Sequence, residues 1–252
     1  MENSKYSLGL VSVSFRKHTP EEIIKAVKEA GLSCIEWGSD IHAPCRDTER
    51  LLDIVRLQTE YGIECSSYGT YFRLGHTPIE ELPRYISAAK MLGTNILRLW
   101  CGTKSGANMT AEERENLFAV CRQAAAMAEE QGVILCMECH HGTFTERPED
   151  TVALMEAVNS PHFRMYWQPF QWLDSDGSLK IAQTVSPYAE HIHVFNWKGS
   201  QKLSLAEAVD TWRVYLSVLP PPRALLLEFM PDDNIETLPV EAEALKTIVG
   251  GM

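Results

Sequence analysis

Short apolar runs alternate with amphipathic stretches along the whole chain. Four stretches join a helix-like segment, a glycine and an apolar run: AVKEAGLSCIEW, QTEYGIECSSYG, AAKMLGTNILRLWCG and MAEEQGVILCMECHH. Their glycines are Gly31, Gly62, Gly93 and Gly132. Because glycine adopts the left-handed conformation that closes a helix, each predicts a helix end followed by a strand. The near-regular spacing indicates a repeated supersecondary unit.

The remaining apolar runs extend this alternation to eight predicted strands. They cover residues 7–15, 33–38, 64–72, 95–101, 133–140, 163–170, 191–197 and 224–230. Amphipathic segments lie between them, and several begin with a capping residue and a proline, as Thr19 and Pro20 do.

Most of these runs are short and apolar on both faces, which is typical of a parallel sheet covered by helices. Eight strand–helix units in 252 residues predict a (β/α)8 TIM barrel, an α/β fold, with residues 1–252 as a single domain. A doubly wound open sheet is the alternative fold, but no GxGxxG motif follows the first strand.

Composition and charge disfavour several classes of protein. Hydrophobic residues make up 45% of the chain and charged residues 23%, as in soluble globular proteins. No apolar run approaches the ~20 residues of a membrane span, and the N-terminal residues lack the pattern of a signal peptide, so we expect a cytoplasmic protein without a membrane partner. The net charge of −11 disfavours nucleic acid as a partner. The seven cysteines are an odd number spread along the chain, which argues against a zinc ribbon or a disulfide framework.

Polar side chains gather at the predicted carboxyl ends of the strands, where the active sites of such barrels lie. Glu138 and Glu228 each follow an apolar run, and a buried carboxylate needs an ion-pair partner, hydrogen bonds or a metal. His191 and His193 lie two positions apart on one predicted strand, and we expect His191 to be structural. Glu138, His193 and Glu228 therefore predict a site for Mn²⁺, Co²⁺, Mg²⁺ or Zn²⁺. A simple salt bridge is the alternative for either glutamate.

Tryptophans mark the same strand ends. Five of the six lie at or just past a predicted strand end, namely Trp37, Trp100, Trp167, Trp172 and Trp197. Indole rings offer flat apolar faces to the C–H faces of a sugar, while polar groups orient its hydroxyls. We therefore expect a small-molecule carbohydrate to bind here, with Trp37, Trp100 and Trp197 among its contacts. Ordinary barrel packing is the alternative for Trp37 and Trp100.

With these residues in place, the chain resembles the xylose-isomerase-like TIM barrels of the sugar phosphate isomerase/epimerase superfamily. The likeness runs from LGLVSVSF to LLLEFMPD. It implies a divalent metal held by a Glu ending strand five, an Asp ending strand six, a His on strand seven and a Glu ending strand eight. The stretches MECHHGT, HIHVFNWKG and LLLEF put Glu138, His193 and Glu228 at three of these positions.

The strand-six position departs from the family's pattern. In MYWQPFQW, Gln168 stands where an Asp is usual, and Gln171 stands three residues later where a His is usual. Glutamine removes one negative charge but keeps a carbonyl oxygen able to coordinate a hard cation. We expect the metal to be retained, with Gln168 as a fourth ligand and Gln171 at a substrate-contacting position. The alternatives are a different metal and a metal-free site in which Gln168 binds the substrate.

The resemblance implies a sugar isomerase or epimerase in which Glu138 and Glu228 move the proton and the metal stabilises the enediolate. Arg98, His140 and Lys198 are expected to orient hydroxyls or to stabilise the enediolate oxygen. No glycine-rich phosphate cradle is visible and the loop MPDDN is acidic, which favours an unphosphorylated sugar, keto-sugar or polyol derivative.

Other classes of function remain as alternatives. A lyase or dehydratase would use the same proton abstraction and then expel a β-hydroxyl. A metal-free sugar-binding protein with a diverged site is the non-enzyme alternative. An endonuclease IV-like nuclease would need more His and Asp ligands and a basic groove, and the sequence provides neither. Exposed aromatic residues such as Phe72 and Phe144 fit a homo-oligomer interface as well as a pocket.

Overall fold

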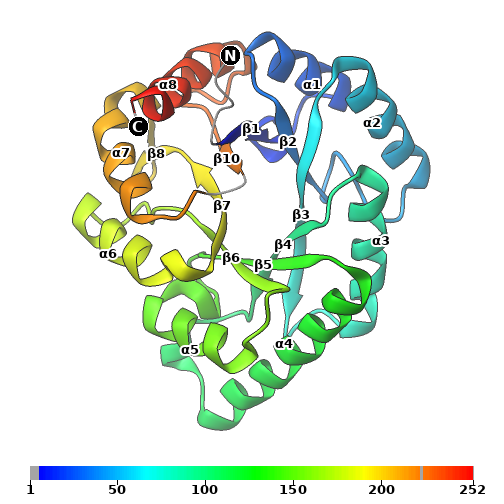
Figure 1. The fold of residues 1–252 in the computed structure, drawn as a ribbon, viewed down its shortest axis with the longest axis vertical. Coiled ribbons are helices and arrows are strands. Elements are labelled where there is room, and N and C mark those ends of the chain that lie inside the picture. Colours follow the sequence, from blue (N-terminus) through cyan, green and yellow to red (C-terminus); the bar gives the residue numbers. More distant parts are fainter. Residues whose placement is uncertain (1–5, 222–223, 252) are drawn as a thin grey trace.

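The computed structural model describes residues 6–221 and 224–251, which form a closed barrel of parallel strands inside a ring of helices (Figure 1). The barrel closes in the order β1-β10-β7-β6-β5-β4-β3-β2. Its strands are β1 (Ser7–Val11), β2 (Cys34–Gly38), β3 (Glu64–Leu74), β4 (Ile96–Cys101), β5 (Ile134–Glu138), β6 (Phe163–Trp167), β7 (Ala189–Val194) and β10 (Ala224–Leu227). The predicted single-domain (β/α)8 TIM barrel is confirmed.

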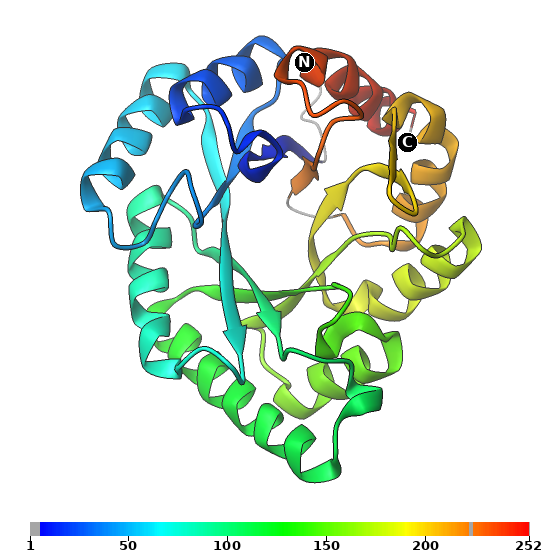
Figure 2. The ribbon, with the colours of Figure 1, turned by 180° about the vertical axis from the view of Figure 1, so that it is seen from behind.

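Helices cover the outside of the barrel on all sides (Figure 2). The α-helices are α1 (Pro20–Glu29), α2 (Thr48–Tyr61), α3 (Leu82–Leu92), α4 (Ala111–Gln131), α5 (Pro148–Val158), α6 (Ser175–Val185), α7 (Val209–Val218) and α8 (Leu238–Gly250). The short 3-10 helices are η1 (Ser12–Phe15), η2 (Ile79–Glu81), η3 (Gly106–Asn108), η4 (Phe144–Glu146), η5 (Ser186–Tyr188), η6 (Leu205–Ala208) and η7 (Ile235–Thr237). Within the described residues, no helix is long and apolar enough to cross a membrane.

The helix boundaries follow the capping signals of the sequence. The Thr19 side chain accepts a hydrogen bond from the backbone N–H of Glu22, and the Glu22 carboxylate accepts one from the N–H of Thr19. This reciprocal pair satisfies two N–H groups that the first turn of α1 leaves without a helical partner. The four glycines that predicted helix ends all have positive φ, between +64° and +87°. The predicted helix ends are confirmed.

The strand ends differ from the prediction. Strands β1, β5, β6, β7 and β10 stop at Val11, Glu138, Trp167, Val194 and Leu227, before the predicted ends of their apolar runs. The chain turns at the barrel rim instead, through η1 after β1 and through a residue of positive φ, Phe229, after β10. Beyond β7, the segment predicted to prolong that strand forms a separate antiparallel hairpin of β8 (Asn196–Lys198) and β9 (Gln201–Leu203).

Apolar side chains fill the barrel below its polar rim. Four of these apolar residues stand two positions before a polar residue of the rim, in the pairs Cys34/Glu36, Ile96/Arg98, Cys136/Glu138 and Leu226/Glu228. Because side chains alternate along a strand, both members of a pair point to the same face. The four apolar members belong to one buried cluster, separate from the larger core between strands and helices. The polar residues at the strand ends therefore pack on a layer of buried apolar side chains inside the barrel.

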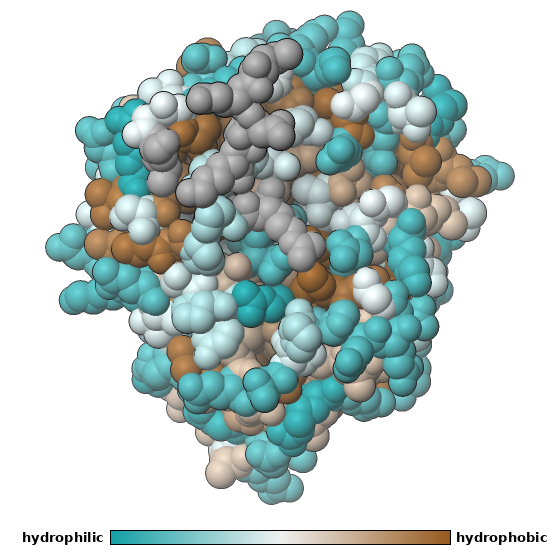
Figure 3. All heavy atoms as spheres, viewed as in Figure 1, coloured by the Kyte–Doolittle hydropathy of each residue, from teal (hydrophilic) through white to brown (hydrophobic). Residues whose placement is uncertain are grey.

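Phe72 and Phe144, expected to be exposed, are fully buried. Phe72 packs edge-on against Tyr85 of α3, and Phe144 packs edge-on against Phe118 of α4. The expectation was wrong because both rings turn back onto the helix layer instead of toward solvent. Figure 3 shows one face of the molecule, where hydrophilic side chains cover much of the surface and hydrophobic patches interrupt them.

Candidate active site

The carboxyl ends of the strands enclose a cavity of about 230 Å³, called here the reaction cavity. Eight of the residues predicted from the sequence line it: Arg98, Trp100, Glu138, His140, Gln168, Gln171, Trp197 and Glu228. His193 is 1% exposed and contacts Glu138, Gln168 and Glu228. The barrel thus brings together residues that lie up to 130 positions apart in the chain (98 to 228).

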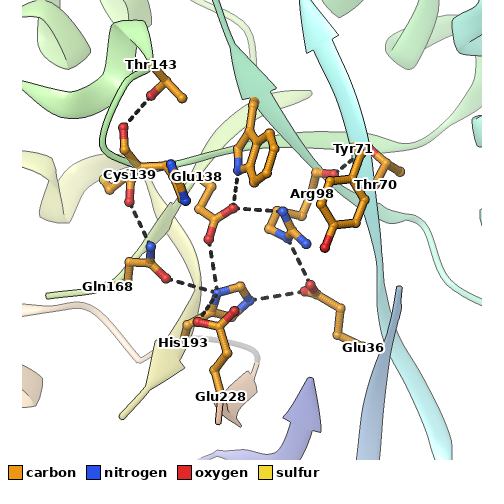
Figure 4. Close-up of polar contacts among 12 residues, drawn as sticks. Glu36, Thr70, Tyr71, Arg98, Glu138, Cys139, Thr143, Gln168, His193 and Glu228 are labelled. Carbon is orange, nitrogen blue, oxygen red and sulfur yellow. Dashed lines mark hydrogen bonds and ion pairs between the residues drawn. The ribbon is translucent and has the colours of Figure 1, made fainter. Parts of the chain in front are cut away.

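Glu138, His193 and Glu228 form a compact cluster of metal-ligating atoms (Figure 4). One ligand atom of each residue lies within 4.8 Å of the others. Nδ1 of His193 is 3.5 Å from Oε1 of Glu138 and 3.5 Å from Oε2 of Glu228. All three side chains are buried. The cluster comes from three separate strand ends, those of β5, β7 and β10.

Gln168 joins this cluster through its carbonyl oxygen. Oε1 of Gln168 lies 3.2 Å from Nδ1 of His193, while Nε2 donates a hydrogen bond of 3.1 Å to the backbone carbonyl of Cys139. Because a carbonyl can only accept, this bond holds the amide with its oxygen toward the cluster. An aspartate at this position has no N–H to donate to Cys139. The carbonyl oxygen of Gln168 therefore points toward the cluster of Glu138, His193 and Glu228.

Glu36 completes the site from the end of β2, and the sequence analysis did not include it. Its carboxylate is 0% exposed and accepts hydrogen bonds of 2.9 Å from the Ser67 hydroxyl and from Nε of Arg98. It also lies 3.4 Å from Nε2 of His193. The signal was present in CIEWG, where a single carboxylate interrupts an apolar strand as in the runs of Glu138 and Glu228.

Arg98 connects the two sides of the site. Its Nη1 donates to Oε2 of Glu138 at 2.8 Å, and Nε1 of Trp100 donates to the same oxygen. These bonds occupy one oxygen of Glu138 and leave Oε1 toward His193. Glu228 differs, because among the described residues only His193 forms an ion pair with its carboxylate, which lines the reaction cavity. The two glutamates are therefore not equivalent.

Burial and neighbouring charges move the pKa values of these groups apart. Burial disfavours the ionised form of Glu138, but Arg98 and His193 outweigh it and lower its pKa to about 2. Burial raises the pKa of Glu228 to about 7 against the attraction of His193, and the charge on Glu138 adds to the rise. Burial also opposes a charge on His193, but Glu228 and Glu36 raise its pKa to about 10. The chain itself leaves Glu228 as the carboxylate that titrates near neutrality.

The donor set fits a divalent cation. Glu36, Glu138 and Glu228 supply three carboxylates, while Arg98 supplies one fixed positive charge, so a neutral His193 leaves two negative charges without compensation. One imidazole nitrogen and oxygens from carboxylates and an amide are ligands that Mn²⁺, Co²⁺, Mg²⁺ and Zn²⁺ accept to different degrees. Cation binding would release the proton that the carboxylates hold on His193.

Trp37 lies away from the reaction cavity, so its expected role as a substrate contact is wrong. Its ring is fully buried, and Nε1 donates a 2.9 Å hydrogen bond to Gln58 of α2. The reason is the alternation of side chains, since Glu36 points into the barrel and its neighbour points outward. Lys198 also lies outside the reaction cavity and lines a neighbouring one.

Further residues that the sequence analysis did not select complete the cavity wall, namely Val13, Arg16, Tyr71, Phe195 and Phe229. Arg16 is fixed by Asp40 at 2.8 Å and donates to the Tyr71 hydroxyl. Tyr71 packs edge-on against Trp100, with 5.2 Å between ring centroids. Val13 and Arg16 follow β1, Phe195 follows β7 and Phe229 follows β10, whereas Tyr71 lies in the second half of the long strand β3. Position at or after a strand end was the signal that could have found them.

Comparison with known families agrees with this geometry. A family model described as "Xylose isomerase-like TIM barrel" matches residues 24–213. The chain belongs to this family. The resemblance inferred from the strand-end residues is therefore confirmed.

One curated relative is a 3-dehydroshikimate dehydratase from Bacillus anthracis. This chain is 23% identical to it over 216 residues, which cover 81% of this chain and 75% of the relative. A crystal structure of a probable 3-DHS dehydratase from the same organism superposes with a TM-score of 0.81 at 16% identity, covering 95% of this chain and 98% of that one.

Other solved structures share the fold at similar coverage. A D-allulose 3-epimerase from Methylomonas sp. gives a TM-score of 0.74 at 14% identity, covering 98% of this chain and 99% of that chain. A xylose isomerase-like TIM barrel protein from Mycobacterium smegmatis, in complex with magnesium, gives 0.69 at 13% identity over the same fractions. Structural relatives of this chain thus include both an epimerase and a dehydratase.

Proposed function

We propose that the protein is a divalent-metal-dependent enzyme that removes the proton next to a carbonyl group of a polyhydroxylated, carbohydrate-like substrate, and that it acts as a sugar isomerase. The observation that carries this proposal is the buried cluster of Glu138, His193 and Glu228, with Gln168 beside it, on the floor of an aromatic-walled cavity. The magnesium complex of a structural relative supports the metal requirement.

The cavity wall provides groups that can orient a sugar. The rings of Trp100, Trp197 and Phe229 offer apolar faces to C–H groups, and His140 and Gln171 offer polar atoms to hydroxyls. Glu138, Gln168, His193 and Glu228 would hold the cation. When bound, the cation would polarise the carbonyl and the adjacent hydroxyl and so make the neighbouring C–H more acidic.

Glu228 is the residue proposed to take the proton. Its carboxylate lines the reaction cavity, and among the described residues only His193 forms an ion pair with it. A carboxylate that faces the substrate in this way can accept a proton and return it. Glu138 is held through one oxygen by Arg98 and Trp100. The expectation that both glutamates act as bases is therefore revised. One base on one face suffices for an isomerisation, whereas epimerisation by proton transfer needs a donor on the opposite face.

A second candidate reaction is the elimination of a β-hydroxyl group. The curated dehydratase relative, aligned over 81% of this chain, supports it. Elimination begins with the same removal of a proton by Glu228, and the protonated carboxyl group could then return that proton to the departing hydroxyl as water. The two reactions share the residues of the site and differ in the product.

Product analysis in heavy water tests both. The protein is loaded with Mn²⁺ and incubated in D₂O with a panel of ketoses and aldoses and with 3-dehydroshikimate, and products are followed by NMR and by ultraviolet absorbance. An isomerase incorporates deuterium at the carbon next to the carbonyl and gives no conjugated product. A dehydratase gives ultraviolet absorbance of a conjugated product.

The control is Glu228→Gln, which should lower either rate by about 10²-fold or more if Glu228 is the base. Full activity in Glu228→Gln would contradict the assignment of the base. Failure of the wild-type protein to exchange or convert any member of the panel would contradict the proposed substrate class.

A further inference from the structure

A second cavity, of about 440 Å³, lies next to the reaction cavity and is called here the outer cavity. It is formed by the segments that follow β6 and β7 and by helices α6 and α7. Its lining combines aromatic or aliphatic side chains with a few polar ones, among them Phe170, Leu173, Asn196, Lys198, Thr211 and Tyr215. It begins at Pro169, directly after the ligand-position residue Gln168.

The two cavities share Phe195 and Trp197 in their walls. The centroids of these two rings are 5.5 Å apart, and the ring of Trp197 lies 5.3 Å from that of Phe229. The amine of Lys202 lies 5.5 Å from the Trp197 centroid. The shared wall is therefore an aromatic ridge between the two cavities.

Trp197 also has an unused hydrogen-bond donor at this ridge. Its Nε1 is buried, and no described group of the protein accepts its hydrogen bond. Most buried N–H groups in proteins have a partner. Trp212, which also lines the outer cavity, is different, because its Nε1 donates to the backbone carbonyl of Phe195 at 3.0 Å. The N–H of Trp197 is therefore a donor at the shared wall that the described protein groups leave without an acceptor.

We propose that the outer cavity binds a second ring of the substrate, so that the enzyme acts on a two-ring hydroxylated compound, such as a glycoside, in preference to a free monosaccharide. The inference rests on the proposed function, because the first ring has to lie at the metal cluster. The oxygen that joins two rings is the acceptor that would meet Nε1 of Trp197. Both a sugar ring and an aromatic ring present the flat faces that suit this lining.

The charges around the outer cavity do not favour a phosphate as its occupant. Lys198 is accompanied by the carboxylates of Asp174 and Glu207 in the same lining. Phosphate sites usually combine several cationic side chains or a helix N-terminus with backbone N–H groups. An uncharged ring with hydroxyl groups therefore fits better than an anionic group.

Binding of matched one-ring and two-ring compounds by isothermal titration calorimetry tests the inference on the Mn²⁺-loaded protein. The one-ring probes are D-glucose and methyl β-D-glucoside. The two-ring probes are cellobiose and maltose, with a sugar as second ring, and phenyl β-D-glucoside, with an aromatic one. We expect at least one two-ring probe to bind about tenfold tighter than its one-ring counterpart. Whether the tighter probe carries a sugar or a phenyl group as its second ring identifies the kind of ring that the outer cavity binds.

Two tryptophan substitutions on the same helix supply the matched comparison. Thr211→Trp places an indole in the outer cavity and should abolish the higher affinity for two-ring probes. Val214→Trp, at a position 48% exposed on α7, should leave that higher affinity unchanged. Trp197→Phe keeps a ring at the ridge but removes the N–H, and should reduce the gain several-fold. Trp197→Phe also keeps the test decisive if Thr211→Trp fails to fold.

The inference is overturned if every two-ring probe binds no tighter than its one-ring counterpart, or if Thr211→Trp leaves the gain unchanged. Because the titration measures binding and not turnover, a tighter binding of a two-ring probe supports the second subsite even if no reaction of the proposed kind is found. Turnover of monosaccharides without any two-ring gain overturns the subsite alone.

Discussion

The Glu36 carboxylate lies 3.4 Å from Nε2 of His193, on the side of the imidazole away from Glu138, Gln168 and Glu228. A carboxylate in this place holds the proton on Nε2 and so leaves Nδ1 available as a ligand. The same carboxylate binds Nε of Arg98, which in turn holds Glu138. Glu36 therefore positions His193 directly and Glu138 through Arg98, two members of the proposed metal site.

Replacing this carboxylate should weaken metal binding. We expect Glu36→Gln to lower the affinity for Mn²⁺ by about 10- to 100-fold, the usual effect of losing a group that orients a metal ligand. Competition with a chelating dye measures the affinity directly and needs no substrate. Glu64→Gln, on the exposed first residue of β3, is the matched control. Equal affinities for both variants would contradict the positioning role.

Gly69 should tolerate no side chain, because it lies under the pair of Glu36 and Arg98. A Cβ atom there would be 2.4 Å from Oε1 of Glu36 and 3.0 Å from Nη2 of Arg98. We expect Gly69→Ala to lower the free energy of unfolding by about 1–3 kcal/mol through overpacking, measured by urea denaturation. Gly250→Ala, where no atom lies within 4 Å of the added Cβ, should be tolerated. Equal stability of the two variants would show that the ion pair can move aside.

Glu228 should make the metal-free protein less stable as pH rises. Its pKa is raised from 4.5 to about 7 on folding, so the folded state binds a proton more tightly than the unfolded state. The destabilisation is absent below about pH 4.5 and is complete above about pH 7. Glutamine mimics the protonated form, so Glu228→Gln should gain about 2–3 kcal/mol relative to wild type between pH 4.5 and 8.

Denaturation at a series of pH values, in the presence of a chelator, measures this difference. A stability difference between wild type and Glu228→Gln that does not change with pH would contradict the raised pKa. The same variant should lose metal affinity, because a carboxylate ligand is missing. Functional sites commonly lower the stability of the ligand-free protein, because their groups are arranged for binding and not for stability.

The glutamine at position 168 should set the strength of metal binding. Gln168→Asp adds a negative charge near His193 but removes the hydrogen bond from Nε2 to the carbonyl of Cys139. We expect tighter Mn²⁺ binding, by about tenfold, because the added charge attracts the cation in a buried site. Gln171→Asp, three residues later on the same loop, is a control for charge alone. If only Gln171→Asp strengthens binding, Gln168 is not at a ligand position.

Much of the site followed from the sequence because its residues mark the places where apolar strands end. Glu138, Glu228 and His193 each stand at the end of a run that must be buried, and such groups need partners. The fold-family pattern then indicated that Gln168 belongs with them. Glu36 carried the same signal, yet its partners Arg98 and His193 are 62 and 157 positions away in the chain, so its role could not be derived from local pattern.

The sequence by itself determined the alternation of strands and helices, because glycine caps and apolar runs act over a few residues. It also placed Glu138, His193 and Glu228 at or near the carboxyl ends of strands, although five strands stop earlier than their apolar runs. Only the tertiary structure decided that Trp37 points away from the cavity and that Phe72 and Phe144 are buried. Only it showed that Glu138 is held by Arg98 and Trp100 while Glu228 faces the cavity. The reason is that barrel closure fixes which strand ends meet, and local sequence carries no information on such distant contacts.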